Sequence, residues 1–490
     1  MDLPREIKNI ITSLEEQGFE GYAVGGCVRD IIKGVDPEDF DVATNAKPEE
    51  VERIFKKSFK DNEFGTVTVL TGSKKENLEK VEVTTYRKED EYEDRRHPSK
   101  VNFVSQIEED LKRRDFTINA MALGLKLCKK KKESYYLIDP FSGKKDLEKK
   151  IIRAVGDPEE RFSEDALRMM RAIRFSSSFG FSIEEKTKRA IKKNAHLLRE
   201  ISRERIRDEF IKIIMSPGAV SGIEELRKLN LLKEFIPELL EGYKVDQSKH
   251  HIYDCYTHYI YSLDYAVRRN FNFYVRMAAL FHDIGKPRVK KGKGEKATFY
   301  NHEVVGARMT KKILERLKFK KEDIEKISLL VRYHLFYYNV GEVSESSVRR
   351  LLRKVGKENI EELLQVRMSD RIGSGVPKAE PYRLRHMRYL IERVSRDPIS
   401  TSMLEIDGND VMKIMNTSPG PIVGEVLNIL LLEVMDDPSK NRRDFLEGRV
   451  KEIGQWNVDE IKKEGKRAYK EVERVETKKD EMTKKKYWVT

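Results

Sequence analysis

The chain has 490 residues, enough for about three domains, and its 39% hydrophobic residues can form sizeable buried cores. Lysine and arginine (97) outnumber aspartate and glutamate (84), and the net charge of +13 favours a polyanionic partner. No run approaches the ~18 apolar residues that a membrane-spanning helix needs, and three scattered cysteines without metal-ligand spacing indicate reduced thiols, so we expect a cytoplasmic protein with no membrane partner.

The first predicted element is an amphipathic helix over residues 1–18. Its apolar residues Ile7, Ile10, Ile11 and Leu14 lie on one face. Between residues 21 and 139, short β-like runs alternate with helical segments, and the predicted strands are GYAVGG, DFDVAT, GTVTVLT and KVEVTTYR. This alternation predicts a small head domain with a mixed sheet and helices, after which the chain turns almost wholly helical.

Two aspartates and two glycines form the most informative motif of the head. Asp39 and Asp41 lie two residues apart, and side chains at that spacing in a strand point to the same face. Two carboxylates aimed at one point predict a magnesium site, because Mg²⁺ prefers oxygen ligands and a polyphosphate. Gly25 and Gly26 would let the backbone approach a triphosphate, and the following helix would turn free N–H groups toward it, with Arg29 one turn in. Together these residues predict a nucleotidyl-transfer site.

A third carboxylate and a second arginine cluster follow in the head. Glu82, in KVEVTTYR, is a candidate third carboxylate beside the aspartate pair, and a surface glutamate is the alternative. The polar segment YRKEDEYEDRRHPSKVNF predicts a mobile loop. In LKRRDFTINAMAL, Arg114 precedes a predicted helical start and could clamp a phosphate, with Asp115 and Asn119 beside it. A solvated charge cluster is the alternative here.

The segment RFSEDALRMMRAIRFSSSFGF predicts a helix that begins at Ser163 or Glu164. Its polar stripe recurs every third residue and consists of Asp165, Arg168, Arg171 and Arg174. A carboxylate beside a guanidinium can read the edge of a base, since both cytosine and adenine offer an amine donor next to a ring acceptor. A salt-bridge ladder on a solvated helix is the alternative for the stripe taken alone.

In this order, the motifs resemble the class II tRNA nucleotidyltransferases, which comprise the bacterial CCA-adding enzymes and their poly(A) polymerase relatives. The matching segments are GGCVRD, DFD, VEVTTYR, RRDFTINAMA, IDPFSGKKDLEKKIIRAVGDP, RFSEDALRMMRAIRF and SRERIRDEF. The resemblance implies that Asp39 and Asp41 hold two Mg²⁺ ions. It also implies that Gly26, Arg29 and Arg114 hold the triphosphate and sugar.

The same resemblance assigns roles to the polar stripe. It implies that Asp165 and Arg168 act as an amino-acid template for incoming CTP and ATP. Arg171 and Arg174 would support the nucleotide or the primer. The partner implied is tRNA, whose 3′ end would be the primer, and no nucleophilic residue of the protein is required.

Six of the nine histidines lie between residues 250 and 334. The candidate metal ligands in and after this region are His258, His282, Asp283, His302, His334 and Asp370. Imidazoles and carboxylates that converge from several helices suit transition metals such as Mn, Ni, Fe or Zn. The segment HDIGKP resembles the HD phosphohydrolase superfamily, and the match implies that His302 and His334 complete a second site while the other four bind the first metal.

The predicted fold class is α+β: a nucleotidyltransferase head followed by helical neck, HD and tail domains. The predicted domains are residues 1–150, 151–235, 236–375 and 376–490. By resemblance the tail binds tRNA, and it contains a predicted apolar helix from Val423 to Met435. Residues 458–490 are mostly lysine and glutamate and predict a solvated helix or a disordered tail, to which no role is assigned.

The function predicted from these motifs is CCA addition to tRNA from CTP and ATP, together with an HD phosphohydrolase activity on RNA ends. Alternatives are an A-adding or CC-adding enzyme, a poly(A) polymerase, and an HD-type RNA phosphohydrolase with a degenerate head. The segment 88–110 is full length, whereas CC-adding enzymes tend to have a shortened loop there, and poly(A) polymerases usually lack an HD unit. A purely RNA-binding protein would show basic patches interleaved with stacking aromatics, a weaker pattern here than the catalytic motifs.

Overall fold

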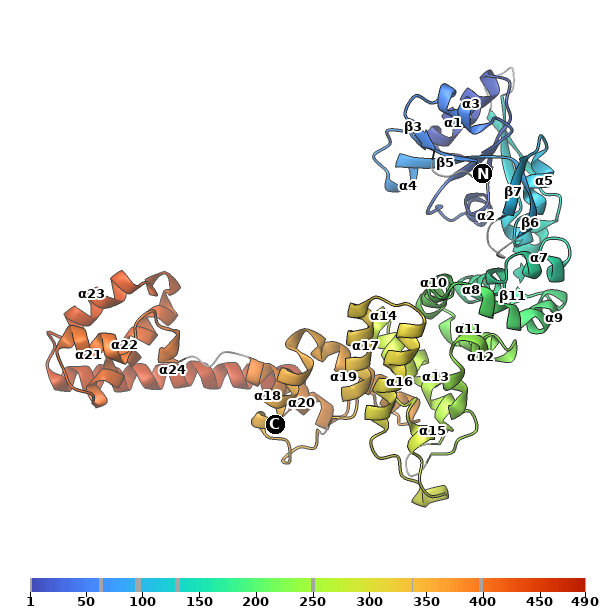
Figure 1. Ribbon diagram of the computed structural model, residues 1–490. Helices are drawn as coiled ribbons and strands as arrows, with labels where there is room; N and C mark the ends of the chain where they lie inside the picture. Colours follow the sequence, from blue (N-terminus) through green and yellow to red (C-terminus); the bar gives the residue numbers. More distant parts are fainter. Residues whose placement is uncertain are drawn as a thin grey trace. The chain divides into compact units, whose positions relative to one another are not determined.

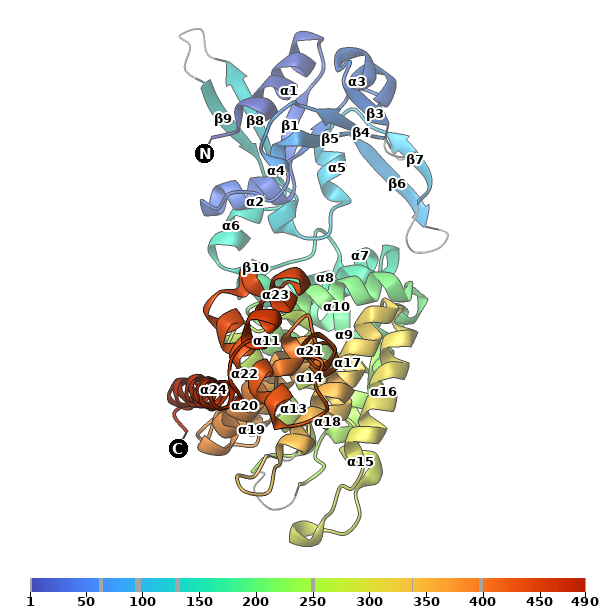
Figure 2. The same ribbon diagram turned by 90° about the vertical axis from the view of Figure 1, so that its left-hand side faces the viewer.

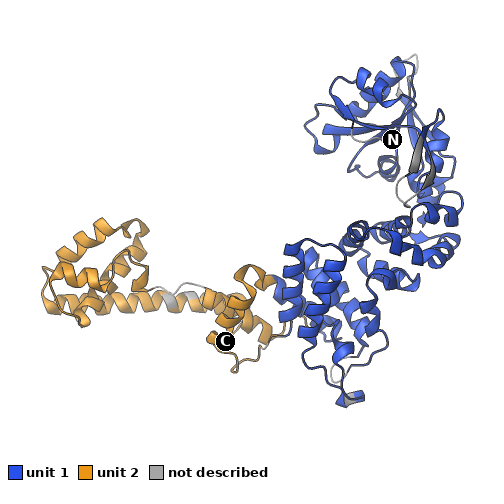
Figure 3. Ribbon diagram, in the orientation of Figure 1, with its two compact units in different colours: residues 1–335, 362–377 blue, residues 336–361, 378–490 orange. Residues whose placement is uncertain are grey.

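The structure is a computed structural model that describes residues 2–60, 65–92, 98–127, 133–247, 252–336, 338–395 and 400–489. The chain forms two compact units (Figure 3). The first comprises residues 1–335 and 362–377, and the second comprises residues 336–361 and 378–490. The second unit therefore includes residues 336–361, which precede the last segment of the first unit in the sequence. The boundaries of the four predicted domains remain predictions.

The first unit begins with a mixed seven-stranded sheet in the order β3-β4-β5-β2-β1-β8-β9 (Figure 2). The strands are β1 (Gly21–Val24), β2 (Asp41–Thr44), β3 (Ser58–Lys60), β4 (Thr66–Leu70), β5 (Lys80–Thr85), β8 (Ala122–Leu127) and β9 (Glu133–Ile138). β2 runs parallel to β5, and the other neighbours in this sheet pair antiparallel. The four predicted strands are confirmed as β1, β2, β4 and β5.

Helices cover both faces of this sheet, because side chains along each strand point alternately to opposite faces. The head helices are α1 (Arg5–Glu16), α2 (Gly26–Lys33), α3 (Pro48–Ile54), α4 (Glu76–Glu79) and α5 (Ile107–Lys112). Ala23 and Val42 pack with α1 and α3 on one face, whereas Val24 and Ala43 pack with α5 on the other. The predicted amphipathic helix is confirmed, since α1 buries the four apolar residues expected.

The prediction of a mobile loop after β5 is wrong for the described residues. β6 (Arg87–Tyr92) and β7 (Pro98–Phe103) form an antiparallel pair in which Arg87 lies opposite Phe103. Residues 93–97 of the predicted loop lie outside the described residues. The two strands pair through backbone hydrogen bonds, so polar side chains do not prevent the pairing. The same polar side chains give no hydrophobic alternation from which the strands could be predicted.

The segment after the head is helical apart from one short sheet. Its helices are α6 (Gly143–Glu148), α7 (Pro158–Glu164), α8 (Leu167–Phe179), α9 (Glu185–Asn194), α10 (Arg203–Met215), α11 (Ala219–Lys228) and α12 (Leu232–Phe235). β10 (Ile151–Ile152) pairs in parallel with β11 (Ser182–Ile183), which corrects the all-helical prediction for the neck. Strands of two residues are too short to show an alternating pattern in the sequence.

The prediction that one helix starts at Ser163 or Glu164 is also wrong. A helix, α7, ends at Glu164, and the next, α8, begins at Leu167. Asp165 lies between them, and its Oδ1 accepts a hydrogen bond from the Leu167 N–H at 3.0 Å. Aspartate is favoured just before a helix, where its side chain accepts a hydrogen bond from a free N–H of the first turn. Asp165 therefore favours the start of a new helix over the continuation of α7.

The histidine-rich region forms a cluster of helices in the first unit. They are α13 (Cys255–Arg268), α14 (Phe273–Phe281), α15 (Lys286–Val289), α16 (His302–Arg316), α17 (Lys321–Tyr333) and α19 (Ile360–Gly373). α14 packs against α13, α17 and α10, so this cluster is continuous with the neck helices. Short 3-10 helices connect the elements of the chain: η1 (Thr117–Asn119), η2 (Ala195–Glu200), η3 (Pro237–Gly242), η4 (Gly294–Lys296), η5 (Lys357–Asn359), η6 (Thr401–Met403) and η7 (Pro438–Lys440).

The second unit is helical (Figure 1). It contains α18 (Glu345–Val355), α20 (Tyr382–Ser395), α21 (Gly408–Met415), α22 (Pro421–Asp436), α23 (Arg443–Ile453) and α24 (Val458–Tyr487). α24 packs along α22 and buries Ile461, Ala468 and Val472, so the charged terminal segment is an integral helix rather than a disordered tail. In the described part of the chain, no helix combines the length and the apolar character needed to traverse a bilayer.

Candidate active site and candidate metal centre

Three carboxylates converge at one end of the central strands of the head. Asp41 is the first residue of β2 and lies opposite Glu82 of the neighbouring strand β5, while Asp39 precedes β2 by two residues. The pKa of Asp41 is raised to about 6, chiefly by burial and then by the nearby charges of Asp39 and Glu82, while the Arg114 guanidinium acts to lower it. Oxygen ligands that repel one another in this way fit a divalent cation, whose charge would relieve the repulsion.

The two predicted glycines lie directly against these carboxylates. Gly25 has a φ of 79°, and a Cβ there would lie 2.8 Å from Arg114 Nη1 and 3.7 Å from Asp41 Oδ2. A Cβ on Gly26 would lie 4.0 Å from Asp39 Oδ1. No side chain covers the backbone at Gly25 and Gly26, where α2 begins, and the first free N–H groups of that helix lie beside the carboxylates.

Two guanidiniums lie next to the same glycines and meet at Asn119. Arg29 donates from Nη1 to Asn119 Oδ1 at 2.8 Å, and Arg114 donates from Nη1 to the Asn119 carbonyl at 3.5 Å. Arg114 also pairs with Asp110 at 3.4 Å. The predicted nucleotide-binding residues of the head are thus brought together by the fold.

Asp115 connects this cluster to the helix that carries the arginine stripe. Its Oδ1 accepts from Asn119 Nδ2 at 3.3 Å, and its Oδ2 accepts from Arg171 Nε at 2.6 Å. Burial opposes ionisation of Asp115, but the adjacent Arg171 guanidinium holds its pKa below the usual range. Asp115 therefore stays ionised and fixes Arg171 of α8 relative to the head.

The remaining stripe residues have partners that were not predicted. Arg168 pairs with Glu164 at 2.6 Å, whereas Asp165 pairs with Arg205 of α10 at 2.7 Å. Asp165 lies outside α8, so the expected four-residue stripe along one helix is corrected to three arginines.

Glu209 on α10 pairs with Arg174 at 3.2 Å, and its side chain is 5% exposed. Arg205 and Glu209 both lie in SRERIRDEF, and opposite charges four residues apart on one helix are the signal that could have identified them.

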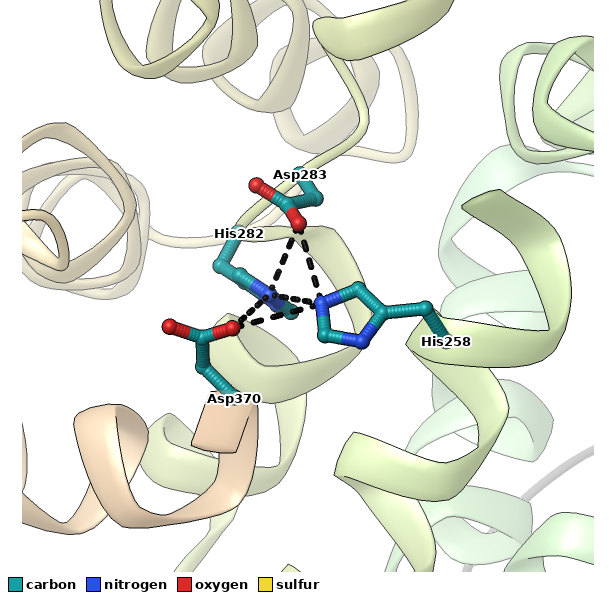
Figure 4. A group of neighbouring side chains, drawn as sticks. All are labelled: His258, His282, Asp283 and Asp370. Carbon is teal, nitrogen blue, oxygen red and sulfur yellow. Dashed lines mark hydrogen bonds and ion pairs between the residues drawn. The ribbon is translucent and has the colours of Figure 1, made fainter. Parts of the chain in front are cut away.

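Four of the predicted metal ligands converge from two helices, α13 and α19, and from the turn after α14 (Figure 4). The Nε2 atoms of His258 and His282 lie 2.9 Å apart. Asp283 Oδ2 lies 2.9 Å from His258 Nε2, and Asp370 Oδ1 lies 3.4 Å from the same nitrogen. Two imidazole nitrogens this close, flanked by two carboxylate oxygens, form a donor set that suits a transition metal.

A second group shares Asp283. Its Oδ1 lies 3.1 Å from His302 Nε2 and 3.5 Å from His334 Nε2. The Nδ1 atoms of His282, His302 and His334 each lie 2.7–2.8 Å from a backbone carbonyl. A carbonyl only accepts, so these rings carry the proton on Nδ1 and present the Nε2 lone pair to the centre, as metal-ligating histidines do.

A pocket of about 410 Å³ opens onto this centre. Asp283 and Asp370 line it together with Lys286, Arg367 and Arg371. Lys286 lies 2.5 Å from Asp283 Oδ2 and is almost fully buried. Basic groups beside a candidate metal centre suit an anionic ligand such as a phosphate ester.

Three family models match separate parts of the chain. Residues 21–153 match the Poly A polymerase head domain, residues 180–242 match a probable RNA and SrmB-binding site of polymerase A, and residues 256–373 match the HD domain. The chain is therefore similar to poly(A) polymerases in its head segment and to HD-domain proteins in a later segment. The matched head segment contains the three carboxylates and both glycines, and the matched HD segment contains all six predicted metal ligands.

Curated relatives carry the name CCA-adding enzyme. The protein of Lactobacillus helveticus (strain DPC 4571) is 51% identical over 209 residues, which are 42% of this chain and 49% of that protein. The protein of Bacillus cytotoxicus (strain DSM 22905 / CIP 110041 / 391-98 / NVH 391-98) is 49% identical over 223 residues, 45% of this chain and 53% of its own length. The chain thus matches about half the length of these relatives.

Solved structures of CCA-adding enzymes share the fold along most of the chain. The CCA-adding enzyme of Bacillus stearothermophilus, in complex with CTP, is 27% identical with a TM-score of 0.55, covering 92% of this chain and 98% of that one. The Thermotoga maritima CCA-adding enzyme, complexed with tRNA, has a TM-score of 0.51 at 20% identity and covers 92% and 96%. The predicted α+β head followed by helical domains is confirmed by the observed elements and by this likeness.

Proposed function

We propose that the chain is a CCA-adding tRNA nucleotidyltransferase, which adds C, C and A from CTP and ATP to the 3′ end of tRNA without a nucleic-acid template. The observation that carries the proposal is the convergence of Asp39, Asp41 and Glu82 beside the bare backbone of Gly25 and Gly26. The curated relatives named CCA-adding enzyme support the choice of reaction. The net charge of +13 suits a tRNA partner, and a cytoplasmic location would suit that substrate.

In this proposal, the head binds the triphosphate and the metals. Asp39 and Asp41, with Glu82 beside them, would hold two Mg²⁺ ions, which when bound lower the pKa of the primer 3′-hydroxyl and stabilise charge at the α-phosphate. Arg29 and Arg114 would bind phosphate oxygens, together with the N–H groups at the start of α2. These residues hold the reacting groups in line, so that no protein nucleophile is needed.

The base would be read by the neck. Asp165 would accept from the exocyclic amine of cytosine or adenine, and Arg168 would donate to the adjacent ring acceptor. Glu164 pairs with Arg168 and Arg205 pairs with Asp165, which favours fixed orientations for both reading groups. We propose that Arg171 and Arg174 support the nucleotide or primer from the same side.

The test is extension of three tRNA transcripts, ending before CCA, after C and after CC, with Mg²⁺ and with CTP and ATP separately and together. Three additions in the order C, C, A to the first transcript are expected. Addition of A alone to the CC-ended transcript would indicate an A-adding enzyme, and arrest after two C residues a CC-adding enzyme. A long A ladder would indicate a poly(A) polymerase. No addition at all would contradict every transferase alternative.

We propose a second, metal-dependent phosphohydrolase activity on RNA ends at the HD centre. The observation that favours it is the ligand set around Asp283, with a pocket that Lys286 and Arg371 line. The test is release of phosphate from RNA ending in a 3′-phosphate, and opening of a 2′,3′-cyclic phosphate end, with Mn, Ni, Fe or Zn supplied one at a time. Equal rates in the wild type and in Asp283→Ala would contradict this second activity.

A further inference from the structure

Three aromatic rings form a column where the head meets the neck. Phe179, at the end of α8, stacks on Phe175 one turn earlier, with ring centroids 5.7 Å apart and planes at 14°. Phe175 in turn meets Phe116 of the head edge-on, with centroids 5.7 Å apart and planes at 84°. Both geometries are favourable for aromatic pairs. The column therefore joins α8 to the segment that follows Arg114.

Two cations of the head helix α2 lie over the outermost ring. The Arg29 Cζ lies 4.7 Å and the Lys33 Nζ 4.2 Å from the centroid of Phe179. Arg29 and Lys33 are one helical turn apart, so a single ring contacts one face of α2. A cation over the face of an aromatic ring is attracted by the ring quadrupole, and the attraction grows when the group is shielded from water.

The next ring carries cations of the neck. Arg174 Cζ lies 4.2 Å and Arg171 Cζ 5.4 Å from the centroid of Phe175. Three of the four cations on these rings, Arg29, Arg171 and Arg174, are proposed nucleotide-binding residues. The stacked pair of rings thus holds such residues from both the head and the neck, and Arg29 lies nearer to Phe179 than to Phe175, whose centroid is 5.7 Å away.

The guanidinium of Arg29 is fixed on its edges as well as on its face. Its Nε and Nη2 donate to the Asp30 carboxylate at 2.9 and 2.7 Å, and its Nη1 donates to Asn119 Oδ1 at 2.8 Å. Both Asp30 and Asn119 belong to the head, so edge contacts alone leave Arg29 free to move with the head. Its face contacts relate Arg29 to α8: the ring of Phe179 is the nearer, at 4.7 Å, and the ring of Phe175 lies at 5.7 Å.

We propose that Phe179 is a positioning residue for the incoming nucleotide, because its ring fixes Arg29 of the head relative to the base-reading neck. This inference rests on the proposed function, since it takes Arg29 as a ligand of the triphosphate. Phe179 need not touch the nucleotide and acts through Arg29. A nucleotide bound by its phosphates to the head and by its base to the neck requires a set distance between the two. The Asp115–Arg171 pair holds α8 against the head, and Phe179 sets the position of Arg29 on that helix.

The experiment compares Phe179→Leu, which removes the aromatic face, with Phe179→Tyr, which keeps it. Equilibrium binding of CTP and of ATP with Mg²⁺ is measured by calorimetry, and KM and kcat are measured by tRNA extension. We expect Phe179→Leu to weaken binding of both nucleotides about tenfold, which is about 1.4 kcal/mol, and to raise KM with little change in kcat. Phe179→Tyr should bind within about twofold of the wild type because cation attraction to the ring is retained.

The matched control is Phe235→Leu, which removes a buried neck ring that packs edge-on against Phe210. We expect it to lower the Tm at least as much as Phe179→Leu does, without changing nucleotide affinity. Unchanged nucleotide affinity in Phe179→Leu, or equal weakening in Phe179→Tyr, would overturn the inference. If the wild type binds CTP and ATP but extends no tRNA, the proposed function fails while the binding data still decide the role of Phe179. A wild type that binds neither nucleotide overturns both.

Discussion

Arg205→Met is expected to weaken the selection of nucleotides. Arg205 donates from two nitrogens to the two oxygens of Asp165, at 3.3 and 2.7 Å, and the two side chains are 23% and 16% exposed. Methionine keeps an unbranched apolar stem but removes both donors and the charge. Asp165 would then keep its hydrogen bond from the Leu167 N–H and lose the pair of contacts that sets the plane of its carboxylate.

The size of the effect follows from these contacts. A hydrogen bond between charged groups contributes about 1.5–3 kcal/mol, and only the shorter of the two contacts has good length. Partial exposure favours the lower half of that range, so we expect a loss of about 2 kcal/mol in the orientation of Asp165, which corresponds to roughly 30-fold. The loss should appear in the ratio of kcat/KM for correct and incorrect nucleotides.

The assay measures kcat/KM for CTP, UTP, ATP and GTP on transcripts ending before CCA and after CC. The control is Arg207→Met on the same helix, whose side chain is also 23% exposed and pairs with Asp208. We expect Arg205→Met alone to lose discrimination. If discrimination is unchanged, or falls equally in both variants, then Arg205 does not orient a reading group.

Three further predictions concern other parts of the chain. Asp41→Asn should lower addition of C and of A alike by at least about a thousandfold, because in the proposed site this charge would bind metal and take no part in base choice; primer extension with each nucleotide checks this. Loss of one nucleotide only would contradict the assignment. Ile461→Ala, which opens a cavity between α24 and α22, should destabilise the second unit by about 2–4 kcal/mol in urea unfolding, and an unchanged midpoint would show that α24 does not contribute to that core. Asp283→Ala should reduce the transition metal retained after dialysis, measured by elemental analysis, because Asp283 faces both histidine groups. The exposed His196→Ala is the control, and equal metal content in the two variants would contradict the centre.

The head and four strands of its seven-stranded sheet could be predicted because local patterns specify them, whereas β3, β8 and β9 were not predicted. Strands with clear hydrophobic content and the amphipathic helix α1 were found at their observed places. The β6–β7 pair was missed because its composition is that of a loop, and its backbone pairing leaves no hydrophobic alternation. The last helix, α24, was left without a role because Ile461, Ala468 and Val472 form a sparse stripe among many charges.

The candidate sites divide in the same way. Motif residues that lie close in sequence, such as Asp39 and Asp41, can be identified from their spacing. Their contacts with residues far along the chain cannot be seen from spacing. Arg205 and Glu209 were missed because they lie on α10, which is separated in sequence from the residues of α8 and its start that they contact. The HD ligands were predicted from an adjacent His-Asp pair, but the position of Asp283 between two histidine groups depends on tertiary packing that spacing cannot show.

The excursion of residues 336–361 into the second unit has a consequence for how the candidate metal centre behaves. His334 lies directly before the excursion and Asp370 lies after the chain has returned, and both approach the shared Asp283 group. A metal bound at this centre would therefore link the two ends of the segment between His334 and Asp370. This link would reduce the conformational entropy that the segment gains when the chain unfolds. Chelation should then loosen α17 and α19 before it affects the head, and the loosening would be visible as faster amide hydrogen exchange at the ends of this segment.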